Sequence, residues 1–278
     1  MKKSCVIFAC TILSEDRVPV LLEFLDGFKK DFLDCDFYIG INPSPVEVLE
    51  ELITDSNIEV KGMARVAEDL YTESDASAYQ LALKLASESN TSYDNYWFIH
   101  TKGSVNTHSD YLRIWYLTNF LSDRSNIESF LNERTGVGSY GMLGVAYSPH
   151  NTYLEQDVGI PLFENIITEA LPYTHANFFY IHSLYVIKGH IVDKFIQLIA
   201  STWFTSKLNS YYFEGIFPFI VSRLGYYPYV SNEIDMNGHS LLESNNSWLS
   251  ENDLVSYKEY LDLHKTNYKF NQLKPPYN

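Results

Sequence analysis

The sequence predicts an α/β fold in which a mostly parallel sheet is flanked by helices. Three observations support this prediction: a globular composition, an alternation of apolar and amphipathic segments, and polar residues placed directly after apolar runs. Of the 278 residues, 46% are hydrophobic and 20% are charged, which is typical of a globular protein. We expect one domain over residues 1–240 and a polar extension over residues 241–278 that packs against it.

Strand-like and helix-like segments alternate over about the first 100 residues. Val20, Phe24 and Phe28 recur at helical spacing, and Ser74 or Asp75 is a suitable N-cap for a later helix. The expected strands are residues 4–12, 36–44, 58–64 and the apolar run within 93–106, and the expected helices are residues 17–32, 45–56 and 74–90. Because helical crossovers join parallel strands, we expect ligands to bind at the carboxyl ends of these strands.

The second half of the chain continues the pattern less regularly. We expect one or two helices over 108–133, a strand over 140–149, a helix over 161–172, a bent strand or strand pair over 175–189, a helix over 190–201 and a short helix within 210–230. Residues 231–278 are polar and are expected to wrap over the domain.

Charge and cysteine content narrow the class of protein. The formal net charge is −15, which disfavours nucleic acid as a partner because phosphate backbones are bound largely through Lys and Arg. Three cysteines without a C-x-x-C pair fit reduced thiols. No apolar run approaches the ~20 residues that span a bilayer. We expect a cytoplasmic protein without a transmembrane segment, and peripheral contact with a membrane stays open.

Several common functional motifs do not occur in the sequence. Neither G-x-G-x-x-G nor G-x-x-x-x-G-K-[ST] follows the first strand, which removes the main support for dinucleotide-binding and P-loop proteins. G-x-S-x-G and H-E-x-x-H are also missing. The chain is rich in aromatic residues, with 22 Tyr and 17 Phe, which suits sugar rings, although an aromatic core explains them equally well.

The stretch "YWFIHTKG" places reactive side chains at the end of a strand. Lys102 offers a point charge suited to a phosphate, and His100 can donate to a phosphate or ligate a metal. Gly103 allows a tight turn and a close approach of the backbone to a ligand. The alternative is a histidine that merely ends a strand, followed by a solvated lysine.

The order of these parts resembles the GT-A type of nucleotide-sugar glycosyltransferases. In that family a strand ends in an Asp-x-Asp motif that binds a divalent metal at the donor diphosphate. The sequence is more specifically similar to a bacterial and viral branch whose strand ends in H-T-K-G, overlapping rhamnan-synthesis, capsule and lipopolysaccharide glycosyltransferases. Further matches are Asp110, Arg113 and Trp115 in the next helix, the strand "YGMLGVAY" and the segment "HANFFYIHS".

The resemblance implies a GT-A-like, Rossmann-like fold and assigns catalytic roles. Lys102, helped by His100, would stabilise the leaving nucleoside diphosphate where relatives use a metal. Glu214 stands where relatives place a carboxylate near the acceptor hydroxyl, although a glutamate at a helix start is also a plain capping charge. Whether a divalent cation, Mn or Mg, is needed stays open because Asp-x-Asp is absent; His100 and His239 are the candidate ligands.

The resemblance also suggests a set of residues that bind the nucleotide-sugar. These residues are Thr11, Asp75, Thr101, Gly103, Arg113, Asn177, Phe178 and His239. N-cap or loop chemistry is the alternative for the residues near the first and third helices. A buried core strand is the alternative for the "HANFFYIH" segment.

The expected function is transfer of a sugar from a nucleotide-sugar to an acceptor hydroxyl of a carbohydrate or glycoconjugate, in surface polysaccharide or glycoconjugate biosynthesis. Two alternatives stay open. One is a non-catalytic module that binds nucleotide-sugars or carbohydrates, favoured by the missing Asp-x-Asp. The other is a phage enzyme that glycosylates modified DNA bases, which the acidic charge disfavours.

Overall fold

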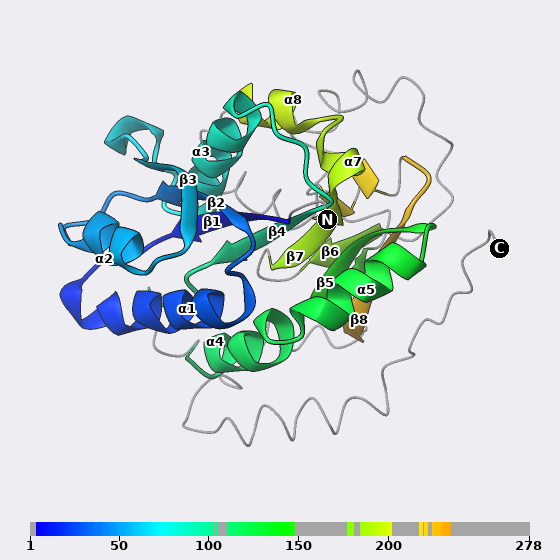
Figure 1. Cartoon of the computed structure of the whole chain (residues 1–278), viewed down its shortest axis with the longest axis horizontal. Coiled ribbons are helices and arrows are strands. Elements are labelled where there is room, and N and C mark those ends of the chain that lie inside the picture. Colours follow the sequence, from blue (N-terminus) through cyan, green and yellow to red (C-terminus); the bar gives the residue numbers. More distant parts are fainter. Residues whose placement is uncertain are drawn as a thin grey trace.

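A mixed sheet of eight strands forms the centre of the molecule (Figure 1). The strand order is β3-β2-β1-β4-β7-β5-β6, and β8 pairs with β5. The computed structural model of the chain describes residues 4–102, 104, 110–147, 177–180, 184–201, 217–218, 220–221 and 224–234. Over these residues the sheet is mostly parallel and flanked by helices, so the predicted α/β class is confirmed.

The N-terminal half of the sheet is wholly parallel. Every residue of β1, β2 and β4 is buried, which explains their continuous apolar runs, because parallel strands are usually covered on both faces. The edge strand β3 is partly exposed. The four strands are β1 (Cys5–Cys10), β2 (Asp36–Ile41), β3 (Glu59–Arg65) and β4 (Asn95–His100).

Helices cover both faces of the sheet (Figure 1). One face carries α1 (Val18–Asp31), α4 (Asp110–Tyr116) and α5 (Arg124–Glu133), with α2 (Leu49–Asp55) beside α1; the other carries α3 (Asp75–Glu88), α7 (Gly189–Val192) and α8 (Ile196–Ser201). The predicted apolar stripe of α1 is buried, and Phe28 packs edge-on against Phe8 of β1 with ring centroids 5.1 Å apart.

The C-terminal half of the sheet is mixed. β7 runs antiparallel to both β4 and β5, β6 runs antiparallel to β5, and β8 runs parallel to β5. The four strands are β5 (Val137–Tyr147), β6 (Asn177–Tyr180), β7 (Tyr185–Lys188) and β8 (Tyr227–Ile234). The strand pair predicted over 175–189 is therefore β6 and β7, and the helical region 108–133 is two helices joined through a π-helical turn at Leu117–Leu121.

Three predicted segments differ from the structure. The single helix predicted over 190–201 is interrupted between α7 and α8, where the amides of Lys194 and Phe195 bond three residues back rather than four. The strand predicted over 36–44 ends at Ile41, before the Asn-Pro pair. Residues 231–234, predicted as the start of the polar tail, are instead the end of β8. The helix predicted over 161–172 and the extension over 241–278 lie outside the described residues.

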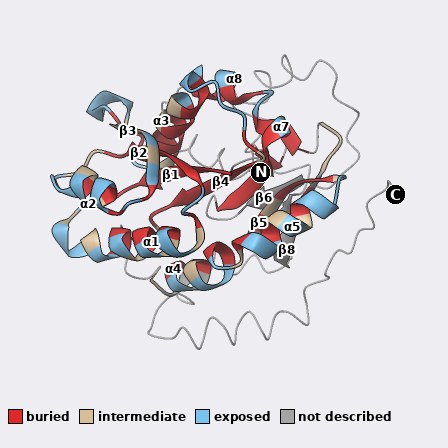
Figure 2. Cartoon of the chain, in the orientation of Figure 1, coloured by how far each residue is buried: buried red, intermediate tan, exposed pale blue. Residues whose placement is uncertain are grey.

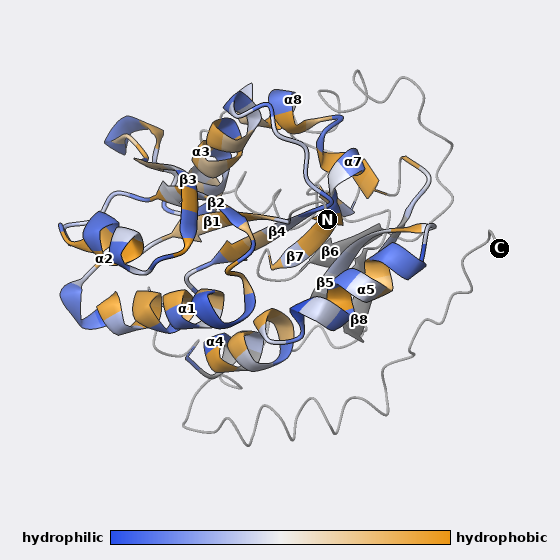
Figure 3. Ribbon diagram, viewed as in Figure 1, coloured by the Kyte–Doolittle hydropathy of each residue, from blue (hydrophilic) through white to orange (hydrophobic). Residues whose placement is uncertain are grey.

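The core lies between the sheet and its two helical layers. Figure 2 shows buried residues along β1, β2, β4 and β7, whereas the outer sides of α1, α2 and α5 are exposed. Figure 3 shows the same division in hydropathy, with apolar residues on the strands and on the inner sides of the helices. In the part of the chain that the structure describes, none of the helices combines the length and the apolar character needed to cross a membrane.

Candidate functional site

The carboxyl ends of β1 and β4 form a topological switch point. From β1 the chain builds β2 and β3 on one side of the sheet, then returns to place β4 on the other side of β1. At such a point the connections leave two neighbouring parallel strands in opposite directions, and open α/β sheets bind ligands there. Thr11 follows β1 and Thr101 follows β4, so two predicted site residues meet at this edge.

Thr101 joins the ends of the two strands. Its Oγ1 accepts a hydrogen bond from the backbone N–H of Thr11 at 2.8 Å and lies 3.1 Å from the carbonyl oxygen of Thr11. Its own backbone N–H donates to the carbonyl of Ala9 at 3.1 Å, and the residue is 2% exposed. Thr101 therefore makes these hydrogen bonds within the protein, where they hold the ends of β1 and β4 together.

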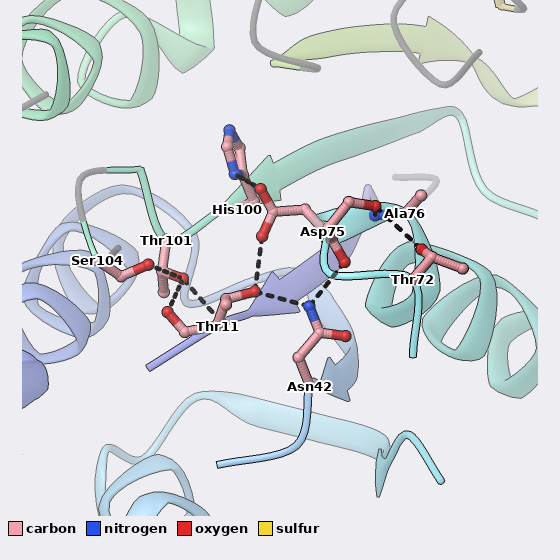
Figure 4. Close-up of polar contacts among 9 residues, drawn as sticks. Thr11, Asn42, Thr72, Asp75, Ala76, His100, Thr101 and Ser104 are labelled. Carbon is pink, nitrogen blue, oxygen red and sulfur yellow. Dashed lines mark hydrogen bonds and ion pairs between the residues drawn. The ribbon is translucent and has the colours of Figure 1, made fainter. Parts of the chain in front are cut away.

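A chain of polar contacts links four elements around Thr11 (Figure 4). Asn42, which follows β2, donates from Nδ2 to Thr11 Oγ1 at 2.8 Å. Thr11 Oγ1 donates to Asp75 Oδ1 at 2.6 Å, at the start of α3. Asp75 Oδ2 in turn lies 2.6 Å from Nδ1 of His100, the last residue of β4. The structure thus brings together Thr11, Asp75 and His100, although Thr11 and His100 are 89 positions apart in sequence.

The start of α3 is held in place by capping. Ser74 is the N-cap, with its Oγ accepting a hydrogen bond from the Ala76 N–H at 3.1 Å, so Asp75 is the first residue of the helix. Asn42 Nδ2 also donates to the carbonyl oxygen of Ser74 at 2.9 Å. Ser77 Oγ accepts from the Thr72 N–H at 3.0 Å. These bonds anchor the loop before α3 to the end of β2.

The electrostatic surroundings keep Asp75 ionised. Burial alone would raise the pKa of the Asp75 carboxyl. The charge of His100, its close contact through Nδ1, the hydrogen bond from Thr11 and the charge of Lys102 outweigh burial and hold the pKa below its ordinary value. Lys102 therefore lies close enough to act on the same carboxylate.

Three buried side-chain atoms of this cluster lack a hydrogen-bond partner within the described part of the chain. They are Asn42 Oδ1 and both ring nitrogens of His100, of which Nδ1 forms the close contact with Asp75 Oδ2. His100 is 6% exposed and Asn42 is fully buried. Since an unsatisfied buried polar group costs about 1–3 kcal/mol, Asn42 Oδ1 and His100 Nε2 are candidate groups for binding a ligand.

Arg113 is engaged in ion pairs on the other side of the sheet. Its Nε lies 2.7 Å from Glu23 Oε2 and its Nη1 lies 2.6 Å from Asp110 Oδ1, which ties α4 to α1. These contacts account for a buried guanidinium without any ligand. The predicted role of Arg113 in nucleotide-sugar binding stays a prediction.

The other predicted site residues are not brought to the cluster by the described structure. Asn177 and Phe178 begin β6, which is separated from β4 by β7 and β5, although Asn177 pairs with Tyr147 at the same edge of the sheet as the cluster. Their roles stay predictions. Gly103, Glu214 and His239 lie outside the described residues.

Asn42 is a site residue that sequence reasoning missed. It joins Thr11 to the loop before α3, and its Oδ1 has no hydrogen-bond partner among the described residues. A signal was present, because Asn42 directly follows an apolar strand whose carboxyl end lies at the same edge as that of β1.

The described residues do not form a complete metal site. No group of three His, Cys, Asp or Glu side chains with a suitable arrangement occurs among them. Asp75 and His100 are the two candidate ligands at this edge, and they already contact each other. The candidate ligand His239 lies outside the described residues, so a role for Mn or Mg is left to experiment.

Comparison of the sequence with protein-family models and with curated proteins gives no match. Among solved structures, a mannosyltransferase from S. cerevisiae is similar over 77% of this chain, with 9% identity and a TM-score of 0.34. Glucosyl-3-phosphoglycerate synthase from Mycobacterium tuberculosis is similar over 84%, with 13% identity and a TM-score of 0.35. This chain spans 62% of the first protein and 71% of the second. Likeness at this level does not assign a function.

Proposed function

We propose that the protein transfers a sugar from a nucleotide-sugar donor to an acceptor hydroxyl. The observation that carries this proposal is the buried cluster at the switch point, where His100 Nε2 has no partner among the described residues and Lys102 follows two residues later. Ligands of open α/β sheets bind at this place. The ordered resemblance to the H-T-K-G branch of GT-A glycosyltransferases supports the choice of ligand.

The chemistry of the cluster suits an anionic leaving group. In glycosyl transfer the bond between the sugar carbon and the phosphate oxygen breaks, and the acceptor oxygen forms a new bond to that carbon. Negative charge then collects on the nucleoside diphosphate, and positive side chains placed there stabilise it. Lys102 supplies a point charge, and the positive end of the α3 dipole lies at the same edge.

The remaining roles follow the resemblance. Thr11 and Asp75 lie on the nucleoside side of the donor, and Glu214 takes the proton of the acceptor hydroxyl. Gly103 gives the diphosphate access to the backbone, and Asn177, Phe178 and His239 complete the donor site. The acceptor is a carbohydrate or glycoconjugate of the cell surface.

The proposal predicts turnover that depends on Lys102. Wild-type protein is incubated with a panel of radiolabelled nucleotide-sugars, and hydrolysis and transfer are both measured. For the donor that is used, Lys102→Ala is expected to lower kcat/KM by about 100-fold, because it removes charge stabilisation of the leaving group. Lys84→Ala is the matched control, since this exposed lysine lies near the opposite end of α3.

Two outcomes would contradict the proposal in different ways. Binding of a nucleotide-sugar with no turnover of any donor would show the non-catalytic module instead. Equal activity in Lys102→Ala and wild type would remove Lys102 from the reaction while leaving the enzyme intact.

A further inference from the structure

We infer that Asp75 is a positioning residue: it holds His100 with Nδ1 turned to the protein and Nε2 presented to a phosphate oxygen of the donor. The inference rests on the proposed function. It changes the role of Asp75, which resemblance alone places on the nucleoside side of the donor. It also explains why a carboxylate lies where an anionic ligand is expected to bind.

The donors and acceptors along the polar chain have one consistent direction. The side-chain nitrogen of Asn42 donates to Thr11 Oγ1, so the hydroxyl of Thr11 uses its single proton for Asp75 Oδ1. In the contact between Asp75 Oδ2 and His100 Nδ1, Asp75 is the ionised partner, because a carboxylic acid is a stronger acid than an imidazolium, and an ionised carboxylate only accepts. The second oxygen of Asp75 is therefore also an acceptor, and it faces His100.

This direction requires a proton on Nδ1 of His100, and contact of Nε2 with a phosphate oxygen requires a second proton there, so His100 binds the donor as an imidazolium. Nδ1 lies 2.6 Å from Asp75 Oδ2, and a bare nitrogen lone pair at this distance from a carboxylate oxygen would be repelled. Nδ1 is therefore protonated, although the contact is an ion pair rather than a well-aligned hydrogen bond. Tyr79 packs near the ring, with centroids 6.2 Å apart, and limits its rotation.

The opposite ring nitrogen is the open end of the chain. Nε2 points away from Asp75 and the other labelled residues (Figure 4). It is buried and has no hydrogen-bond partner in the described structure. Four elements, namely β2, β1, α3 and β4, thus cooperate to hold one nitrogen in place. Such second-layer carboxylates orient histidines in many binding sites.

The charge of Asp75 makes the inference testable, because two explanations predict opposite changes in diphosphate binding when that charge is removed. If Asp75 acted on the donor only through its negative charge, Asp75→Asn would strengthen binding of a diphosphate. If Asp75 positions His100, Asp75→Asn weakens binding by about tenfold, since the ring loses its preferred orientation. The probes are UDP, GDP and inorganic pyrophosphate, measured by calorimetric titration of wild type and variant.

Two further variants complete the binding experiment. Thr11→Val removes the hydrogen bond to Asp75 without changing any charge and is expected to weaken binding in the same direction. Asp55→Asn is the matched control, because this exposed carboxylate ends α2, away from the carboxyl edge of the sheet, and its loss is expected to change nothing.

A spectroscopic measurement tests the orientation of His100 without any ligand. The ring nitrogens of the eight histidines are observed by long-range ¹H–¹⁵N NMR, and His100→Gln identifies the signals of His100. We expect a protonated Nδ1 in the wild type and a loss of this preference in Asp75→Asn. The same spectra show whether the variant is folded.

The outcomes separate the inference from the proposed function. Wild-type protein that binds none of the three probes overturns the proposed function, while the spectra still decide the orientation of His100. Wild-type protein that binds a diphosphate, together with an Asp75→Asn variant that binds as tightly or more tightly, overturns the positioning role alone. An unprotonated Nδ1 of His100 in the spectra of the wild type also overturns the positioning role.

Discussion

Neighbouring residues at the end of β4 have different tasks. Thr101 uses its hydroxyl and its backbone N–H to join β4 to β1, so its contacts serve the fold. His100 spends one ring nitrogen on Asp75 and keeps the other without a partner in the described structure. Thr101 thus holds the end of the strand in place, whereas His100, the residue before it, keeps one ring nitrogen available to a ligand.

Among single residues, Lys188 gives the strongest prediction about the stability of the protein. This residue of β7 is 8% exposed and donates from Nζ to the carbonyl oxygen of Arg134 at 2.8 Å. Burial lowers the pKa of the Lys188 ammonium from 10.5 to about 8. Holding the charged form in the folded protein therefore costs free energy below pH 8.

The sign of the pH dependence follows from the lowered pKa. Between pH 8 and 10.5 the unfolded chain keeps a proton that the folded protein has released, so the contribution of Lys188 to stability rises with pH. From pH 7 to 9.5 wild type should gain about 2 kcal/mol in free energy of unfolding relative to Lys188→Met. Urea unfolding at each pH measures this difference, and the buried cysteines and tyrosines cancel because both proteins contain them.

The control for this prediction is Lys84→Met, which replaces an exposed lysine. Its difference from wild type should not change over the same range of pH. A constant difference for Lys188→Met as well would show that Lys188 has an ordinary pKa.

The sequence predicts where a side chain lies when this depends only on its position relative to a strand. His100 ends β4, Lys102 follows it and Thr11 follows β1, which is enough to place all three at the carboxyl edge of the sheet. The contact between Asp75 and His100 was not predicted, since 25 positions separate them and no local pattern links a helix start to a strand end. Such pairs become visible only when α3 is placed on the sheet.

At the scale of elements, the approach of α3 to β2 sets the geometry of the cluster. Gly40 lies in β2, and a Cβ atom there would stand 2.0 Å from the carbonyl oxygen of Ala78 in α3. The backbone of the helix thus lies directly on the strand, one turn from Asp75. This contact needs a glycine because no side chain fits between the two backbones.

We predict that Gly40→Ala destabilises the protein by about 3 kcal/mol or more, since the helix must move away from the sheet. The same displacement moves Asp75 and should weaken diphosphate binding. Gly27→Ala in α1 is the matched control, because its new Cβ would meet the methyl groups of Leu117 and Leu121 at ordinary contact distances of 3.5 Å. This control should be neutral or stabilising by up to ~1 kcal/mol. Similar urea midpoints for both variants would contradict the prediction.

The predicted elements were correct where periodicity and burial agreed. The alternation in the first 100 residues gave β1 to β4 and α1 to α3 within a few residues of their ends. The helix predicted over 190–201 failed because Ile191, Phe195 and Ile199 keep a helical spacing across a turn that interrupts the helix. The position of that turn depends on tertiary contacts. One of them is the hydrogen bond from Tyr96 Oη to Asp193 Oδ1 at 3.0 Å.

At the scale of the whole molecule, an acidic chain presents a basic side chain at its candidate site. The chain carries a formal charge of −15, whereas the cluster has Lys102 and the ring of His100 at its open end. An acidic protein repels polyanions from most of its surface. A small anion that reaches the switch point meets Lys102 and the positive end of the α3 dipole, whereas a DNA duplex must approach a much larger area.

This contrast predicts selectivity between two phosphate ligands. At about 50 mM salt, where electrostatic binding to DNA is strong, fluorescence anisotropy should detect no binding of a labelled duplex, while UDP or GDP binds in calorimetric titration under the same conditions. Duplex binding that weakens linearly with log salt would instead favour the enzyme that glycosylates modified DNA bases, because such a slope counts the phosphates neutralised by Lys and Arg. The variant Lys102→Ala, which is expected to lose diphosphate binding, separates two ways of binding DNA. Duplex binding by a distant basic surface should be unchanged in this variant. Duplex binding should be abolished only if the DNA binds at the switch point itself.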